Sequence, residues 1–335
     1  MAVPKVCIDR LLPADLMAHR DRSDDRAIIP IGKLWMNGTT LRVRFLDGTP
    51  QQRAKATEQA SWWTEHANLH FAFGDDPAAE IRVAFDPNDG AWSYVGTDIR
   101  GIPLDQPTMN LGFLDGGTAG HEFGHSIGLA HEHQNPAGGI EWNEQVVIAA
   151  LSGPPNNWNE AQIRHNVLEK YRVDQVKGTE FDPDSIMLYF FPGTWVKSGV
   201  GTHANDVLSA MDQGYVASAE AYPKDGTTTE QATELTVNAS STAASIGKPG
   251  EEDLFTVVVT TGGTHVVETS GDTDVVVKLY GPDSPTDLLA TDDDSGAGLN
   301  ARIVAKLVPG RYYVQVRHYN TAQGTGDYGI RIRRP

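Results

Sequence analysis

The segment that most constrains this 335-residue chain is His121-Glu122-Phe123-Gly124-His125-Ser126-Ile127-Gly128-Leu129-Ala130-His131. Residues four apart on a helix project from the same face, so His121 and His125 can present two imidazoles to one Zn²⁺. Gly128 can adopt the left-handed conformation that ends a helix, and the resulting turn would return His131 as a third ligand. Three protein ligands leave one coordination position open, which is typical of catalytic zinc, whereas structural zinc has four protein ligands.

A carboxylate beside the first ligand indicates the chemistry of this segment. Glu122 follows His121 directly, and a glutamate there can take a proton from a zinc-bound water. The short pattern of two histidines and one glutamate also arises by chance on solvated helix faces. The longer pattern fixes five positions, so the sequence predicts one catalytic Zn²⁺ with Glu122 as the general base.

A second motif, Ser185-Ile186-Met187-Leu188-Tyr189, follows downstream. The two motifs together resemble those of the metzincin metalloproteases, in which a methionine-containing turn follows the zinc helix. Glu132 after the third histidine and the tyrosine of the second motif are similar to the astacin branch. The resemblance implies roles for seven residues: His121, His125 and His131 as zinc ligands, Glu122 as general base and acid, Met187 as a hydrophobic floor, Tyr189 as a transition-state donor, and Glu132 as a structural residue.

The chain also departs from the usual astacin pattern. It reads Glu132-His133-Gln134-Asn135-Pro136 where astacins usually have Glu-Gln-x-Arg, and Leu188 precedes the tyrosine where they have histidine. Astacin catalytic domains normally carry disulfides, but Cys7 is the only cysteine and cannot form one within the chain. The match is therefore to a divergent, bacterial or fungal, astacin-like group.

The order of elements predicts the architecture. Residues 31–223 contain alternating strand patterns, a helix at about 50–67 and a helix from about 118, followed by helical stretches at about 144–150, 160–171 and 208–222. We therefore expect an α+β catalytic domain, which the resemblance makes a mixed twisted sheet with an active-site helix. Residues 1–30 are an N-terminal extension or pro-segment, and the polar residues 224–235 are a linker.

The last part of the chain, residues 236–335, consists of short β-branched runs separated by Gly, Asp and Pro. This pattern predicts an all-β sandwich, jelly-roll-like, of about 100 residues. The segment resembles the bacterial pre-peptidase C-terminal (PPC) domain through Glu252–Phe255, Pro309–Val316 and Gly326–Tyr328. Such domains accompany secreted proteases, so the resemblance implies an extracellular destination, although the sequence contains no recognisable signal peptide.

The resemblance makes the strand at residues 92–96 the candidate edge of the substrate cleft, with Trp92, Ser93 and Tyr94 as substrate-binding residues. An exposed edge strand can pair with an extended peptide through main-chain hydrogen bonds. The alternative is an ordinary buried strand in which Trp92 and Tyr94 serve for packing.

Charge and hydropathy limit the partners. The formal net charge of −17 argues against nucleic acid, because phosphate binding needs basic patches. The sequence contains no apolar run of about 18 residues that would cross a membrane. The resemblance implies protein or peptide substrates, and we expect a monomer.

Two further sites have competing interpretations. Cys7 precedes the catalytic domain, where a thiolate could occupy the open zinc position and keep the enzyme latent; most lone cysteines are instead small buried apolar residues. Five aspartates form two turns of the C-terminal domain and could bind Ca²⁺, or could be solvated acidic turns. These candidate calcium ligands are Asp272, Asp274, Asp292, Asp293 and Asp294.

These observations predict a zinc-dependent endopeptidase with an appended β-sandwich. The alternative is a latent or non-catalytic secreted binding protein with a structural zinc site, in which the sandwich docks to a surface. The intact glutamate and the three-ligand spacing favour the enzyme.

Overall fold

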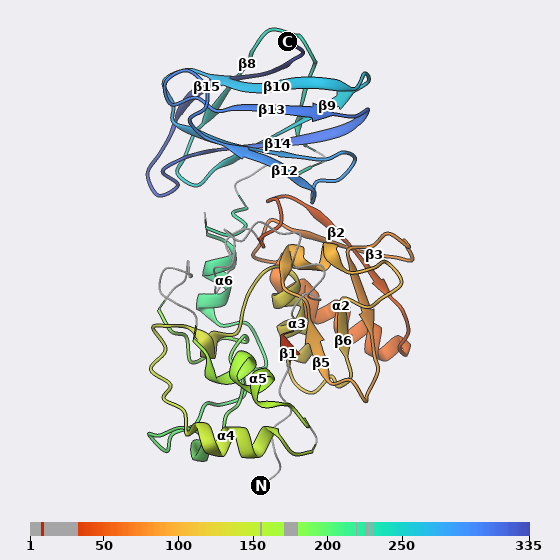
Figure 1. Ribbon diagram of the computed structural model, residues 1–335, viewed down its shortest axis with the longest axis vertical. Coiled ribbons are helices and arrows are strands. Elements are labelled where there is room, and N and C mark those ends of the chain that lie inside the picture. The colour runs from red at the N-terminus through yellow and green to blue at the C-terminus, as the bar shows by residue number, and fades with distance from the viewer. Residues whose placement is uncertain are drawn as a thin grey trace. The chain divides into compact units, whose positions relative to one another are not determined.

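The computed structural model describes residues 8–9, 33–154, 156–170, 180–218, 220–224, 228–229 and 231–335 (Figure 1). Their contacts divide them into two compact units. The first contains the described residues up to 215, except 36–40 and 66–70, which belong to the second unit together with 216–335. The predicted boundaries at 223 and 236 stay predictions.

The first unit is built on a six-stranded mixed sheet with the strand order β1-β5-β6-β4-β2-β3. β2, β4 and β6 are parallel, β5 is antiparallel to β6, and β1 is parallel to β5. The predicted mixed sheet is therefore present. The strands are β1 (Ile8–Asp9), β2 (Thr40–Phe45), β3 (His70–Phe73), β4 (Ile81–Ala84), β5 (Ala91–Ser93) and β6 (Met109–Leu111).

Two helices of the first unit, α2 (Pro50–Thr64) and α3 (Thr118–Ser126), pack against each other. A capping box of Thr49 and Gln52 begins α2, with proline at the first helical position, where its missing N–H costs nothing. The Trp63 indole donates a 2.7 Å hydrogen bond to the carbonyl of Gly120 in α3. A Cβ on Gly124 would lie 2.8 Å from the Trp63 ring, so glycine permits this close approach.

Beyond α3, the first unit continues with short helices, of which α4, α5 and α6 are labelled in Figure 1. Several of these helices pack around a cluster of buried apolar side chains. The helical stretch expected at 160–171 begins at Glu160 and ends at Leu168, because Glu169 is extended. The helices are α4 (Glu144–Leu151), α5 (Glu160–Ile163), a π-helical turn (Arg164–Leu168), α6 (Ala210–Val216), and 3₁₀ turns at Gly96–Gly101, Glu132–Gln134 and Gly193–Trp195. The core residues are Trp142, Val147, Leu151, Trp158, Ile163, Val167, Phe191, Trp195 and Val196.

The second unit contains the predicted β-sandwich. A four-stranded sheet has the order β13-β10-β15-β8 and a five-stranded sheet the order β12-β11-β14-β9-β7. All pairs are antiparallel except β7 with β9. The strands are β7 (Thr233–Leu235), β8 (Thr242–Ile246), β9 (Glu252–Val259), β10 (Gly263–Ser270), β11 (Val275–Tyr280), β12 (Leu288–Asp292), β13 (Arg302–Leu307), β14 (Gly310–His318) and β15 (Gly326–Arg333).

Alternate residues of both sheets form one apolar core, as period-two side-chain alternation requires. Val257, Val314 and Ile330 are fully buried in it. Tyr312 is buried too, and its hydroxyl is hydrogen-bonded to the backbone of Val308, which satisfies the one polar atom of this ring. No helix among the described residues is long and apolar enough to cross a membrane.

Candidate metal centre

The end of α3 positions two of the three motif histidines. Gly128 has φ +107°, its N–H bonds the His125 carbonyl at 2.8 Å, and the Leu129 N–H bonds the Gly124 carbonyl at 3.0 Å. This pair of bonds is a Schellman motif, which ends the helix and reverses the chain. The turn also directs the Leu129 carbonyl to His125, whose Nδ1 lies 2.8 Å away. Gly128 therefore has the conformation expected from the sequence.

The three histidines converge through their Nε2 atoms. His125 Nε2 lies 3.1 Å from His121 Nε2 and 2.9 Å from His131 Nε2, and all three residues are buried. Among the described residues, these three alone bring three or more candidate ligand atoms within 4.8 Å of one another. The sequence spacing and the turn at Gly128 thus produce the expected cluster.

The protonation of two rings fits a metal ion. A carbonyl only accepts, so His121 Nδ1, 2.7 Å from the Ile186 carbonyl, and His125 Nδ1 must both carry a proton. In their neutral form, these rings direct the lone pairs of their Nε2 atoms at each other. Such lone pairs repel unless a cation lies between them, and neutral imidazoles are good zinc ligands. The donor set fits Zn²⁺.

The turn at residues 185–187 contacts both the loop that carries His131 and the helix α3. The Met187 carbonyl accepts the N–H of Glu132 at 3.0 Å, which ties this turn to the loop carrying the third histidine. Met187 is 3% exposed, and a Cβ on Gly124 of α3 would lie 2.5 Å from its sulfur. The methionine therefore lies directly against α3, and its role as a hydrophobic floor stays a prediction.

Asp212 on α6 supports this turn and was not singled out by sequence reasoning. Its carboxylate accepts hydrogen bonds from the Ser185 hydroxyl at 2.7 Å, the Ile186 N–H at 2.8 Å and the Ser209 N–H at 3.0 Å. Ile186 in turn offers its carbonyl to His121. Burial raises the pKa of Asp212. The only sequence signal was an aspartate three residues after a serine at a helix start.

Two glutamates flank the first and third histidines. Glu122 is on α3 and fully buried. Glu132 is 8% exposed and accepts hydrogen bonds from Asn135 Nδ2 and from the Asp182 N–H, each at 2.9 Å. Burial raises the pKa of Glu132 to about 7 despite these bonds. These partners lie in the loop after the third histidine and beside the turn at residues 185–187, and the structural role of Glu132 stays a prediction.

Tyr189 lies against the third histidine. Its hydroxyl contacts His131 Nε2, and the two ring centroids are 4.5 Å apart. A phenol here can donate a hydrogen bond to an oxygen bound near the histidines. The structure thus places Tyr189 at the cluster itself.

The edge of the candidate cleft strand is occupied in this structure, and the substrate-binding role of Trp92, Ser93 and Tyr94 stays a prediction. β5 is the second strand of the sheet, because β1 pairs in parallel with it, Ile8 opposite Trp92 and Asp9 opposite Ser93. Trp92, Ser93 and Tyr94 are all less than 9% exposed. The strand edge expected to be exposed is thus covered by a short segment from the N-terminal extension.

The remaining predicted residues do not join the centre. Cys7 lies outside the described residues. Desolvation, and then repulsion from Asp293, Asp274 and Asp292, raises the pKa of Asp294. Their carboxylates, with that of Asp272, do not form a cluster as tight as the histidines in the described part of the chain. Calcium binding there stays a prediction.

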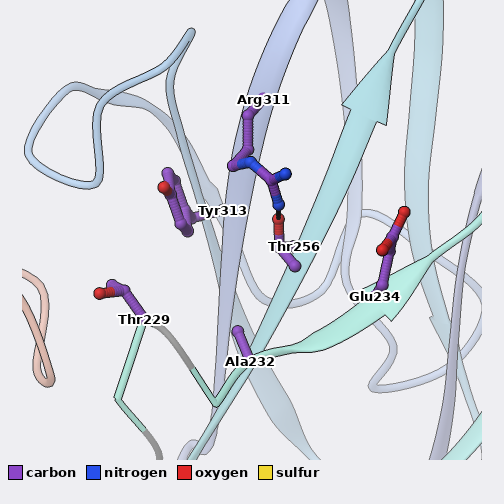
Figure 2. Close-up of a pocket in the computed structure, with 6 residues that line it drawn as sticks. All are labelled: Thr229, Ala232, Glu234, Thr256, Arg311 and Tyr313. Atoms are coloured by element: carbon purple, nitrogen blue, oxygen red, sulfur yellow. Dashed lines mark hydrogen bonds between the residues drawn. The ribbon is translucent and has the colours of Figure 1, made fainter.

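A pocket of about 380 Å³ lies in the second unit, between β7, β9 and β14 (Figure 2). The Arg311 guanidinium points toward Thr256 and donates a 3.1 Å hydrogen bond to its hydroxyl. The pocket contains none of the predicted site residues. Its lining consists of Thr229, Ala232, Glu234, Thr256, Arg311 and Tyr313.

Comparison with known proteins decides the family. The family model of the astacin peptidases matches residues 29–202, which is more than half of the chain. The chain belongs to the astacin family. The model of the bacterial pre-peptidase C-terminal domain matches residues 251–318, inside the sandwich. The resemblance to an astacin-like domain followed by a PPC domain is thereby confirmed, and the astacin domain is a zinc metalloendopeptidase domain.

Individual relatives agree with this assignment. The structure of myroilysin has 34% sequence identity and a TM-score of 0.54, over 56% of this chain and 94% of that one. Zinc metalloproteinase nas-38 of Caenorhabditis elegans is 26% identical over 48% of this chain, but the match spans only 20% of that astacin-family relative. Astacin-like metalloprotease toxin 5 of Loxosceles gaucho is 29% identical over 47% of this chain and 77% of its own length.

Proposed function

We propose that the protein is a secreted zinc-dependent endopeptidase that cleaves proteins or peptides. The observation that carries the proposal is the convergence of three imidazole Nε2 atoms, two of them fixed as lone-pair donors by the Ile186 and Leu129 carbonyls. We assign His121, His125 and His131 as the zinc ligands. Zinc would supply a Lewis acid that polarises the scissile carbonyl and acidifies water.

The side chains around the histidines would transfer the proton, stabilise the developing charge and support the site. Glu122 takes a proton from the attacking water as its oxygen bonds to the carbonyl carbon, and delivers that proton to the amine when the C–N bond breaks. The Tyr189 hydroxyl donates a hydrogen bond to the carbonyl oxygen as negative charge develops there. Met187 excludes water below the histidines, and Glu132 with Asn135 holds the loop that carries His131.

The test compares Glu122→Gln with Glu58→Gln, the same change at an exposed position of α2. Zinc content by atomic emission and gelatin hydrolysis are measured on each preparation after removal of the N-terminal segment. We expect one zinc in all three proteins and chelator-sensitive cleavage in wild type and Glu58→Gln only. Absence of zinc from wild type, or cleavage by Glu122→Gln at the wild-type rate, would overturn the assignment.

We also propose that the N-terminal extension keeps the enzyme latent. The pairing of β1 with β5 supports this, because a substrate that extends the sheet beside β5 would need the same main-chain edge. Removing residues 1–30 should raise kcat/KM for a peptide substrate. The additional hypothesis that Cys7 binds the zinc predicts that Cys7→Ser alone raises activity; unchanged zinc affinity and activity would contradict it.

Secretion is supported by the toxin relatives and by the PPC domain, and the monomeric state stays a prediction. Fractionation of cells and medium, followed by size-exclusion chromatography with light scattering, tests both. Recovery of the protein from the cytosol alone would contradict secretion.

A further inference from the structure

The outward face of the four-stranded sheet carries a cluster of basic side chains, which we call the arginine face. β10 is the second strand of this sheet, with β13 on one side and β15 on the other (Figure 1). Glu268 on β10 lies directly opposite Arg302 on β13 and Arg331 on β15. The arginine face comprises Arg302, Lys306, Arg331 and Arg333 around Glu268.

Strand alternation explains why these side chains gather on one face. Ile330 and Ile332, the neighbours of Arg331 on β15, are fully buried in the sandwich core, so the arginines at 331 and 333 point outward. Ile303, the neighbour of Arg302 on β13, is also buried in the core, so Arg302 points outward. The register then places these cations on the two strands that flank Glu268.

Glu268 orders the guanidinium groups but leaves most of their donors available. Its carboxylate accepts from Arg331 Nε at 2.8 Å and from Arg333 Nε at 2.9 Å, and lies 3.8 Å from Arg302 Nε. The side chains of Arg302, Arg331 and Arg333 remain 41%, 47% and 32% exposed. Three guanidinium groups carry five N–H donors each, far more than one carboxylate can accept.

The arginine face is therefore a local cationic surface on a chain whose net charge is −17. The outward residues of this sheet carry four cations and two carboxylates, Glu268 and Asp327, so the face keeps an excess of two positive charges at neutral pH. Guanidinium groups bind sulfate and carboxylate in bidentate geometry. Because Glu268 already restricts two of them, less rotamer entropy is lost when an anion binds.

We propose that the arginine face binds a linear anionic polysaccharide carrying sulfate or carboxylate groups, and so docks the enzyme to an anionic matrix. Arg302 and Arg331 stand on strands separated by two spacings, about 9.6 Å, and Arg331 and Arg333 are two residues apart, about 6.8 Å. A sheet face with cations at such intervals suits an extended polymer with recurring charges.

Other polyanions fit the arginine face less well. The outward residues on these strands include no aromatic ring on which the bases of a nucleic acid could stack. They include no Trp, Phe or Leu to insert into a bilayer, and Val304 is the exposed apolar residue among them. The outward residues are Ala243, Ser245, Thr264, Val266, Glu268, Ser270, Arg302, Val304, Lys306, Asp327, Gly329, Arg331 and Arg333.

The test measures binding of the full chain to immobilised heparin, alginate and neutral dextran, the first two separating sulfate from carboxylate recognition. Arg331→Gln/Arg333→Gln is compared with Arg311→Gln/Arg317→Gln, the same charge change on β14 of the other sheet. We expect about tenfold weaker binding to at least one charged polymer for the first pair only, and weaker binding at 0.5 M salt.

A second pair, Arg302→Gln/Lys306→Gln, leaves the bonds between β15 and Glu268 in place, and it should also weaken binding if the first pair disturbs folding. Equal binding to dextran, equal loss in the β14 control, or no binding at low salt would overturn the proposal. Binding to anionic vesicles or to duplex DNA that is tighter than binding to either polysaccharide would identify a lipid surface or DNA as the partner instead. Because no cleavage is measured, the outcome does not depend on the proposed peptidase activity.

Discussion

Replacing Asp212 should loosen the metal centre although the residue does not touch a histidine. In Asp212→Ala, the N–H groups of Ile186 and Ser209 lose their acceptor, and the Ser185 hydroxyl must find another. Each buried donor without a partner costs about 1–3 kcal/mol. Removing a desolvated carboxylate, whose pKa burial raises, returns part of that cost.

The net expectation for Asp212→Ala is a loss of about 3 kcal/mol in the free energy of unfolding of the catalytic domain. Asp212→Asn keeps one acceptor oxygen and removes the buried charge, so it should lose only about 1–2 kcal/mol. The Ile186 carbonyl would also orient His121 less well. Loss of such an outer partner lowers metal affinity by about 10–100-fold.

Urea unfolding of the zinc-loaded chain, followed by tryptophan fluorescence, measures the stability, and competition with a chromophoric chelator measures zinc affinity. Asp75→Ala, at an exposed aspartate of the same unit, is the matched control and should behave as wild type. If Asp212→Ala unfolds at the same urea concentration as this control and binds zinc as tightly, the hydrogen bonds of Asp212 do not support the centre, and the reasoning is refuted.

Three further changes test other parts of the structure. Gly128→Ala forces a side chain into φ +107° with Leu34 Cδ2 3.1 Å from the new Cβ, so we expect about 2 kcal/mol lower stability and weaker zinc binding, by the same two assays. Tyr312→Phe leaves the Val308 carbonyl and N–H without their partner and should cost the sandwich about 1–2 kcal/mol in urea unfolding; an unchanged midpoint would contradict this. Hydrogen bonds from Arg333 and Arg331 lower the pKa of Glu268 below its usual 4.5, so its contribution to stability is present above pH 4.5 and is lost as pH falls through the lower folded-state value. Glu268→Gln should flatten that acid-side loss in thermal melts recorded from pH 6 to 3, and an identical pH dependence would exclude the linkage.

Local patterns were sufficient to predict most of the elements. The helix from Thr118, the turn at Gly128 and six of the seven strands from Glu252 onward follow from periodicity and turn residues within a few positions. β7, β8 and β12 were not predicted, because Thr233–Leu235, Thr242–Ile246 and Leu288–Asp292 are short and largely exposed edge segments with weak hydrophobic alternation. Their pairing partners, rather than their own composition, make them strands.

The sequence by itself determined the chemistry of the centre, because histidines four apart on a helix and a glycine-terminated turn are local geometry. Only the tertiary structure decided which groups hold that chemistry in place. The Ile186 carbonyl that accepts from His121 lies 65 residues further along the chain. The Asp212 carboxylate, which accepts from the Ile186 N–H, lies further along again. The cover of β1 over β5, and the assembly of Arg302, Glu268 and Arg331, depend on strand order. Strand order is set by the burial of whole faces over long sequence separations, and no local pattern encodes it.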